Sequence, residues 1–426
     1  MCIITLSSTH DKFSWLIGKN PNTLIAVKSI RKGHAYGYYD DKSDNKTYVV
    51  YFDDSSNEMS YKEYHNQQFE YLNTLQYTSP VCIVNLLSEF FKSAVSIKNK
   101  DDIVCKNNLF CNLVKIEKRS IHIINKFLSY FTNVSMEIIN KGLDIYTVNI
   151  FSENLYILIH FAHIIFITIS CVGANDLYID NCLTEKLVNS VCELDSPYFV
   201  RYLILSRVVH RKSYNHIKNM INISPSHSYF LHFGNTEDHR IEFIKNYFDK
   251  TQSILDFGCG EGYYVKSFAP TISSTYYAFD IDENEIKKVQ NKIKLHNINN
   301  VVTLTQYDQV VKNCNNLQNL FIIVSEVIEH MEIENSTESI INLINDLQFK
   351  TMIITTPNYE FNQFYIMNTQ FRHSDHKLEF TKTEFEKYFT NIVTNVNKLI
   401  KYEYIDIGDS VDNISCTQGV LITTRE

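Results

Sequence analysis

The sequence predicts an α/β fold with a mostly parallel sheet for the C-terminal part of the chain, and a separate α+β domain before it. Two observations carry this prediction. From about residue 253, short apolar segments typical of strands alternate with helical segments, which is the pattern of βαβ units. A glycine-rich turn, Leu255–Gly262, joins the first of these strands to a helix. We expect a linker near Ile223–His227, with an N-terminal domain at 1–230 and a C-terminal domain at 235–426.

The expected elements follow from apolar spacing. In the N-terminal domain they are strands at 1–9, 33–39 and 47–52 and helices at 11–19, 81–97 and 183–211. In the C-terminal domain they are strands at 253–257, 275–280, 301–305, 320–324 and 352–355 and helices at 237–250, 261–268, 283–296 and 335–348. Residues 100–150 show no pattern that orders them.

One segment is apolar enough to require a membrane test. Leu155–Val172 has 18 residues, the lower limit for a bilayer-spanning helix. It contains His160 and His163, is rich in β-branched residues and lacks flanking basic clusters. We therefore expect buried strand and helix pieces of a soluble core and no membrane partner.

Charge and cysteine usage limit the functional classes. A net charge of −8 argues against a protein that coats nucleic acid without discrimination. The basic stretches Arg207–Lys212 and Lys287–Lys294 are expected to be solvated helix faces, although a local groove for one RNA end stays open. The ten cysteines form no C-x-x-C pair, and no signal peptide is recognisable, so we expect a cytoplasmic protein with reduced thiols.

The glycine-rich turn predicts a nucleotide-type cofactor site. Glycines at G-x-G-x-G spacing let the backbone approach a ligand closely, and the carboxyl ends of parallel strands form the binding crevice. Asp280 ends the next strand and can accept hydrogen bonds from both ribose hydroxyls of an adenosine. The D-x-G-x-G pattern with Asp256, Gly258 and Gly260 resembles the first motif of class I (Rossmann-like) methyltransferases, and Asp280 fits their second motif. The resemblance implies S-adenosylmethionine as cofactor.

A second cluster follows the strand at 320–324. If a helical turn begins there, Glu326, Glu329 and His330 share one face at i, i+3 and i, i+4 spacing. Two carboxylates and an imidazole suit Mg²⁺ or Mn²⁺. An acidic helix start without a metal is the alternative.

Four ordered blocks resemble the HEN family of RNA 3′-terminal ribose 2′-O-methyltransferases. The blocks are DFGCGEG, EVIEHM, TPNYEFN and FRHSDHKLEFT. The family's metal ligands fall on Glu326, Glu329, His330 and His376, which the resemblance also makes the catalytic residues. It implies an RNA substrate with a free 3′-terminal 2′,3′-diol, both of whose hydroxyls the Mg²⁺ or Mn²⁺ ion binds, and a role in RNA repair or 3′-end protection.

The chain departs from the family pattern in places. Phe380 replaces a tryptophan and Leu378 a phenylalanine, and both keep an apolar filler beside the ligands. Asp308-Gln309 replaces Gly-Ser at the cofactor site, so adenine recognition stays open. Asn362 and Arg372 are candidates for holding the terminal phosphate or base; a turn residue and a surface charge are the alternatives.

The first 230 residues resemble the N-terminal module of bacterial HEN-type proteins more diffusely. The similar segments are Met1–Asn22, Lys32–Tyr39, Asn154–His160, Cys171–Asp176 and Arg201–Leu203. The resemblance implies an interaction module that activates an RNA ligase and partners a polynucleotide kinase-phosphatase. His34 and His163 are expected to be surface or core histidines.

Two other functions stay open on the sequence alone. The chain could be a class I methyltransferase on another substrate, with a structural acidic cluster, or chiefly an activating subunit of an RNA ligase. The presence of all four ligand positions argues against a dead site.

Overall fold

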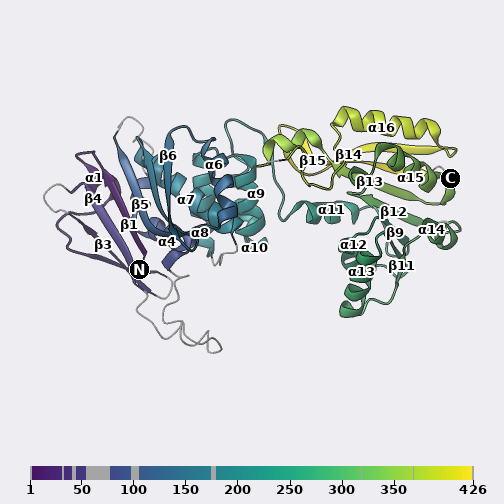
Figure 1. Ribbon diagram of the computed structural model, residues 1–426, viewed down its shortest axis with the longest axis horizontal. Helices are drawn as coiled ribbons and strands as arrows, with labels where there is room; N and C mark the ends of the chain where they lie inside the picture. Colours follow the sequence, from purple (N-terminus) through teal and green to yellow (C-terminus); the bar gives the residue numbers. More distant parts are fainter. Residues whose placement is uncertain are drawn as a thin grey trace. The chain divides into compact units, whose positions relative to one another are not determined.

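The computed structural model describes residues 2–30, 33–40, 45–53, 77–96, 105–173, 179–317, 319–367 and 369–424. The chain divides into two compact units, Met1–Ser226 and His227–Glu426 (Figure 1). The expected motifs of the second unit lie within the described residues, whereas Lys32 and part of the segment Cys171–Asp176 lie outside them.

The second unit is built on one eight-stranded sheet in the order β11-β10-β9-β12-β13-β15-β14-β8. The five strands from β11 to β13 run parallel, and β15 inserts antiparallel between β13 and β14. The strands are β8 (Tyr229–Phe230), β9 (Ser253–Phe257), β10 (Tyr276–Phe279), β11 (Val301–Leu304), β12 (Leu320–Ser325), β13 (Thr351–Pro357), β14 (Ile400–Val411) and β15 (Ile414–Thr424). This topology confirms the predicted class I methyltransferase fold.

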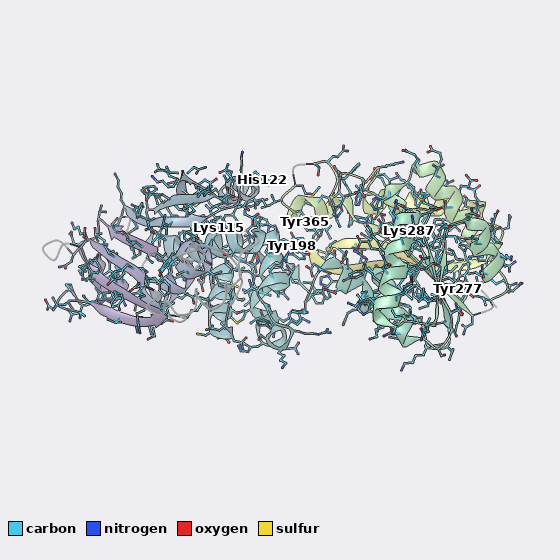
Figure 2. The ribbon with its side chains drawn as sticks, turned by 60° about the horizontal axis from the view of Figure 1, so that its bottom comes forward. Lys115, His122, Tyr198, Tyr277, Lys287 and Tyr365 are labelled. Atoms are coloured by element: carbon cyan, nitrogen blue, oxygen red, sulfur yellow. The ribbon has the colours of Figure 1, made fainter. Side chains whose placement is uncertain are left out.

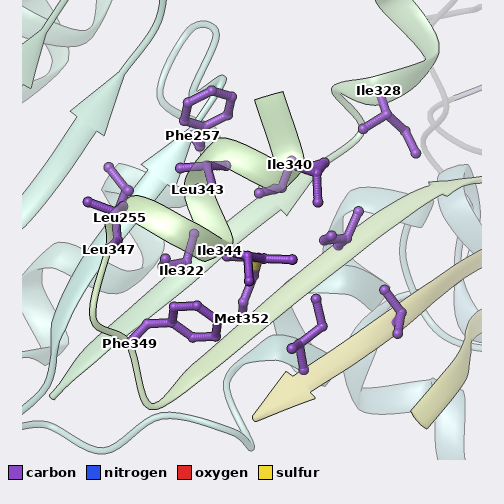
Figure 3. Packing of buried hydrophobic residues seen from close by; sticks show 14 of the residues in the cluster. Leu255, Phe257, Ile322, Ile328, Ile340, Leu343, Ile344, Leu347, Phe349 and Met352 are labelled. Atoms are coloured by element: carbon purple, nitrogen blue, oxygen red, sulfur yellow. The ribbon is translucent and has the colours of Figure 1, made fainter. Parts of the chain in front are cut away.

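Helices connect the parallel strands and cover the sheet. They are α11 (Thr236–Ile244), α12 (Tyr263–Phe268), α13 (Glu283–His296), α14 (Tyr307–Cys314), α15 (Ile333–Asp346) and α16 (Lys382–Asn395), with short 3₁₀ helices η3 (Ala269–Thr271), η4 (Ile328–His330) and η5 (Tyr359–Phe364). Figure 3 shows α15 laying Leu343 and Ile344 over Leu255, Ile322 and Met352 of three adjacent strands. All five side chains are fully buried. This core fixes the strand ends at which the site residues lie.

The first unit contains a seven-stranded antiparallel sheet in the order β2-β3-β4-β1-β5-β7-β6. Its strands are β1 (Cys2–Ser8), β2 (Ala26–Ile30), β3 (Gly33–Tyr39), β4 (Thr47–Asp53), β5 (Asn107–Lys115), β6 (Val134–Gly142) and β7 (Ile145–Ser152). Its helices are α1 (Phe13–Ile17), α4 (Pro80–Phe90), α5 (Lys92–Ser96), η2 (Lys118–Ser120), α6 (Ile121–Leu128), α7 (Leu155–Val172), α8 (Asn181–Glu193), α9 (Tyr198–Arg207) and α10 (Arg211–Ile221). The predicted α+β class is confirmed, and the unordered segment 100–150 supplies three of the strands.

The expectation for Leu155–Val172 was partly wrong, because the segment forms one continuous helix, α7, and contains no strand pieces. Among the described residues this helix alone is long and apolar enough to cross a membrane, yet it is 89% buried inside its own unit. His160 lies 2.8 Å from Ser190 and His163 lies 3.1 Å from Ser88, so the buried imidazoles have partners on the neighbouring helices. The helix is the central core helix of the first unit.

The structure also shows where the expected helix at 183–211 and two histidines lie. The single helical region expected at 183–211 is two helices, α8 and α9, because Pro197 begins the second. His163 is a core histidine and His34 is exposed on β3. Lys287, labelled on α13 in Figure 2, is exposed as expected for a solvated face.

A buried arginine organises the helical layer of the first unit. The Arg201 side chain is fully buried, and its Nε donates to the carbonyl of Ser196 at 2.7 Å. Its two NH groups donate to the carbonyls of Ile221 and Ile223 and to the Asp195 carboxylate. The guanidinium therefore joins the α8–α9 connection to the end of α10.

Replacing this arginine should destabilise the first unit. Arg201→Met would leave one carboxylate and three carbonyls without their donor, and we expect a loss of roughly 3 kcal/mol in the free energy of unfolding. Urea unfolding followed by circular dichroism measures it. Arg207→Met, which removes the same charge from an exposed position of the same helix, is the control, and equal midpoints for the two variants would contradict the assignment.

Candidate active site

The glycine-rich turn between β9 and α12 forms one wall of a cavity. Gly258 has φ +79°, and a Cβ there would lie 2.6 Å from Cγ2 of Val327. Gly260 has φ +48°, but a Cβ there would meet no atom within 4 Å. The first glycine is thus required by packing and the second leaves open space on the ligand side.

The cavity has a volume of about 570 Å³, which is in the range of small-ligand sites. Gly258, Gly260 and Asp280 line it, and Glu326 and His330 line its other side. Asp280 Oδ2 accepts the Gly260 N–H at 2.8 Å and Oδ1 accepts the Asp282 N–H at 2.9 Å. These bonds hold the carboxylate at the cavity wall, where its remaining lone pairs can accept hydrogen bonds from the hydroxyl groups of a ribose.

Asp256 lies beneath this turn and is buried. Burial raises the pKa of its carboxyl group to about 7, although the Tyr276 hydroxyl donates to Oδ2 at 2.8 Å. Asp256 does not line the cavity. Its carboxyl group lies beneath the glycine-rich turn and accepts a hydrogen bond from Tyr276.

The structure does not bring Asp308 and Gln309 to the cavity, contrary to the expectation for the cofactor site. Gln309 is the third residue of α14, and its Oε1 accepts the Thr305 and Gln306 N–H groups as part of a capping box. Asp308 is exposed, and Tyr307 is the residue of this turn that lines the cavity. The Gln309 side chain caps the start of α14 and therefore does not reach the cavity where the adenine would bind.

Glu329 is the centre of the second cluster. Its side chain is fully buried on η4, where Thr356 donates to Oε2 at 3.1 Å, while Oε1 has no hydrogen-bond partner. Burial and the neighbouring Glu326 raise the pKa of Glu329 well above its ordinary value. A buried carboxylate oxygen without a donor is the kind of atom that a cation satisfies.

His376 reaches this carboxylate from a distant segment. The N–H groups of Lys377 and Leu378 both donate to the Glu329 carbonyl, at 2.8 and 3.3 Å. Ligand atoms of Glu329, His330 and His376 consequently lie within 4.8 Å of one another, and the two imidazole rings are 4.7 Å apart. Leu378 packs against the core and Phe380 is buried in it, so the two substituted positions still act as apolar fillers.

A network behind the cluster orients His376. Its Nδ1 lies 2.6 Å from Oε1 of the buried Glu379, which favours Nδ1–H as the donor and would leave Nε2 for a metal ion. The Arg372 backbone N–H donates to Glu379 Oε1, and the Asn362 side chain donates to Oε2. These bonds hold the pKa of Glu379 below its ordinary value, despite its partial burial.

Asn362 and Arg372 therefore serve the protein interior in this structure. Arg372 Nε donates to Asn362 Oδ1 at 2.7 Å, and its NH groups donate to the carbonyls of Asn358 and Cys416. The sequence suggested a contact to the terminal phosphate or base. In the structure Asn362 donates to Glu379, and the Arg372 side chain holds Asn362 in place.

Glu326 lies at the cavity but differs from the expected geometry. Its φ is +57°, so it terminates β12 in a left-handed conformation and shares no helical face with Glu329 and His330. Its Oε1 accepts from Thr355, and its Oε2 lies 3.5 Å from Arg240. The helical spacing argument was wrong because the 3₁₀ turn begins only at Ile328.

Sequence reasoning missed Arg240, which lies on α11 almost ninety residues before Glu326. Burial acts to lower the pKa of Arg240, but Glu326 raises it above its ordinary value. Arg240 Nε donates to the Tyr264 hydroxyl, which pairs in turn with Ser325 at 2.7 Å. No local spacing marks this arginine, whereas Glu379, at i+3 from His376, could have been found from the sequence.

The sheet order, the glycine turn and the Asp280 wall together define the second unit as a methyltransferase domain of the class that uses S-adenosylmethionine. Residues 233–390 match a methyltransferase domain family. Residues 3–224, more than half of the chain, match the family described as the Hen1 N-terminal domain. The chain belongs to the Hen1 family.

Curated relatives match part of the chain. The chain is 28% identical over 207 residues to a small RNA 2′-O-methyltransferase of Xenopus tropicalis, covering 44% of this chain and 54% of that one. It is 27% identical over 194 residues to the enzyme of the same name from Arabidopsis thaliana, covering 40% of this chain and 20% of that one. The chain thus matches about half, or less, of the length of these relatives.

A solved structure resembles the whole chain. A chain in the structure of a Pnkp1/Rnl/Hen1 RNA repair complex superposes with a TM-score of 0.80 at 23% identity, covering 99% of this chain and all of that one. The similarity shows that the fold of both units is shared.

The position of Glu379 predicts its effect on metal affinity. Glu379→Gln weakens the hold on the His376 tautomer and should lower the affinity for Mn²⁺ by about 10–100-fold. Isothermal titration of the full-length protein with Mn²⁺ measures it. Glu384→Gln, which removes the same charge from an exposed capping position, is the control. Unchanged affinity in Glu379→Gln would show that the contact does not position the imidazole.

Proposed function

We propose that the protein transfers the methyl group of S-adenosylmethionine to the 2′-hydroxyl of the 3′-terminal ribose of RNA, with a divalent cation at the second cluster. The observation that carries the proposal is the unpartnered Glu329 Oε1, buried beside two imidazoles, one of which, that of His330, lines the cofactor cavity. The named relatives, small RNA 2′-O-methyltransferases, support the substrate class.

The residues at the two sites suit S-adenosylmethionine and a divalent cation. The Gly260 opening and Asp280 suit the adenosine half of S-adenosylmethionine, and a Cβ at position 260 would enter that space. Glu329, His330 and His376 would hold the cation, with Glu326 as a fourth ligand from the cavity wall. This donor set of carboxylate and imidazole groups accepts Mg²⁺ or Mn²⁺.

The roles of the side chains follow from their surroundings. A bound cation lowers the pKa of an RNA hydroxyl that it contacts, which makes the oxygen a better nucleophile at neutral pH. Burial and the neighbouring His376 lower the pKa of His330, so its imidazole is neutral and available as a ligand. Glu379 keeps the His376 ring in one tautomer. The methyl carbon passes from sulfur to the 2′ oxygen, and S-adenosylhomocysteine and a proton are the other products.

We further propose that the first unit is an interaction module, residues 1–226, through which the protein joins an RNA ligase and a polynucleotide kinase-phosphatase in the cytoplasm. The match to the Hen1 N-terminal domain supports this role, as does the shared fold with a chain of an RNA repair complex. Its antiparallel sheet and helical layer carry no group of metal ligands among the described residues.

The state of the RNA 3′ end should decide whether methylation occurs. With tritiated S-adenosylmethionine and Mn²⁺, an RNA with a free 3′-terminal diol should accept one methyl group per end, because the reacting hydroxyl and its neighbour are both available to the cation. The same RNA with a 3′-phosphate or a 2′,3′-dideoxy end should accept none.

One variant accompanies this measurement. Glu329→Gln keeps an acceptor for Thr356 but removes the charge, and it should abolish transfer while cofactor binding persists. Equal transfer to blocked and free RNA would refute the proposed substrate, and full activity of Glu329→Gln would refute the cation.

The module proposal is tested by association. Full-length protein mixed with the RNA ligase of its own source should elute as a complex on size-exclusion chromatography, and should raise the rate of RNA sealing. An active ligase that neither co-elutes nor accelerates would contradict it. A Glu329→Gln protein should still bind, because the substitution lies in the second unit.

A further inference from the structure

A second group of candidate ligands lies in the methyltransferase unit, away from the cluster described above. His232, His239 and Asp409 bring ligand atoms within 4.8 Å of one another. His232 follows β8, His239 lies in the first turn of α11 and Asp409 lies on β14. Residues more than 170 positions apart thus converge at one point.

Asp409 is turned inward by an irregularity of its strand. The pairing of β14 with β15 shifts register between Ile407 and Ser410. Gly408 within this bulge has φ +82°, and a Cβ there would lie 3.1 Å from His239 Nδ1. The carboxylate that results is fully buried and accepts the His232 backbone N–H at 2.7 Å. A bulge of this kind commonly re-aims a side chain towards a site.

The buried imidazole of His239 indicates that a ligand binds here. The residue is 94% buried, and neither ring nitrogen makes a hydrogen bond of regular geometry, although the Phe233 backbone lies near enough to act on the pKa of the imidazole. Every neutral imidazole carries one N–H, and leaving it unsatisfied in the interior costs about 1–3 kcal/mol.

The distances fit a shared ion. His232 Nδ1 lies 3.3 Å and His239 Nδ1 lies 3.8 Å from Asp409 Oδ1. Two ligand atoms on one tetrahedral Zn²⁺ lie roughly 3.4 Å apart, given metal–ligand bonds of about 2.1 Å. The two rings are 5.1 Å apart and inclined by 49°, so they are not stacked face to face.

We propose that His232, His239 and Asp409 form a second divalent-cation site, of the imidazole-rich type that Zn²⁺ occupies. Two imidazoles and one carboxylate are a donor set that zinc uses in proteins, with a fourth position left for water. The cation joins the β8–α11 connection to the bulge of β14 and supplies the partner that His239 lacks. The cation also fixes the start of α11. Arg240, the residue after His239 on this helix, pairs with Glu326 at the cofactor cavity.

The test is zinc binding by the full-length protein. Metal-free protein is titrated with Zn²⁺ against a chromophoric chelator in excess Mg²⁺. The compared proteins are wild type, His232→Ala, Glu329→Gln and His227→Ala. His227 is the matched control, because it pairs with Asp412 at 2.8 Å but belongs to no group of three ligands among the described residues.

We expect one zinc ion that remains bound in Glu329→Gln and in His227→Ala. In His232→Ala its affinity should fall by more than the roughly 10–100-fold that losing an outer partner of a metal site causes. Zinc should also raise the thermal unfolding midpoint of the wild type and leave that of His232→Ala unchanged. Equal binding in His232→Ala and His227→Ala, or loss of all zinc in Glu329→Gln, would overturn the proposal.

A measurement on unmutated protein guards against a misfolded variant. Co²⁺ added in excess Mg²⁺ should give the visible absorption of a four-coordinate site, and the band should persist in Glu329→Gln. No band and no tight zinc would mean that a water molecule alone occupies the space, which also overturns the proposal. Methyl transfer is not read in either experiment, so this site and the proposed function can fail separately.

Discussion

The carbonyl oxygen of Glu329 is the atom on which the proposed active site depends. It accepts two N–H groups from the chain just after His376, and this clamp brings together segments almost fifty residues apart. Asn358 and Phe380 form an isolated bridge beside it, which extends the same attachment. Without these backbone bonds the His376 loop has no defined position, and the buried carboxylate would face no second imidazole.

The side chain of the same residue creates the electrostatic need for a cation. A carboxylate that is fully buried, and that lies near a second carboxylate, is unfavourable in its charged form. The protein supplies one hydroxyl donor to Oε2, and Arg240 pairs with Glu326 rather than with Glu329. A two-plus ion beside the two imidazoles would compensate for the charge of the Glu329 carboxylate, which supports the proposed metal site.

Helix α11 links the two clusters of the methyltransferase unit. His239 and Arg240 are consecutive residues, and both are buried, but they face different groups. The histidine lies against Asp409 and the arginine against Glu326. A cation held by His239 would therefore fix the position of the arginine that balances the cavity wall. The Asn235 capping box supports the same helix start.

The sequence determined the parts that depend on local spacing. Strand–helix alternation and the glycine turn predicted the class I fold, since the type of each element and its place along the chain follow from short-range patterns. The same patterns predicted where the acidic cluster and Asp280 would stand, at the carboxyl ends of strands. Only the tertiary structure decided the partners of the polar side chains: Glu326 with Arg240, Arg372 with Asn362, Gln309 with its own helix start, and His232 and His239 with Asp409. The contact of Glu326 with Arg240 and that of both histidines with Asp409 join segments far apart in the chain, and such contacts arise from packing that no local pattern encodes.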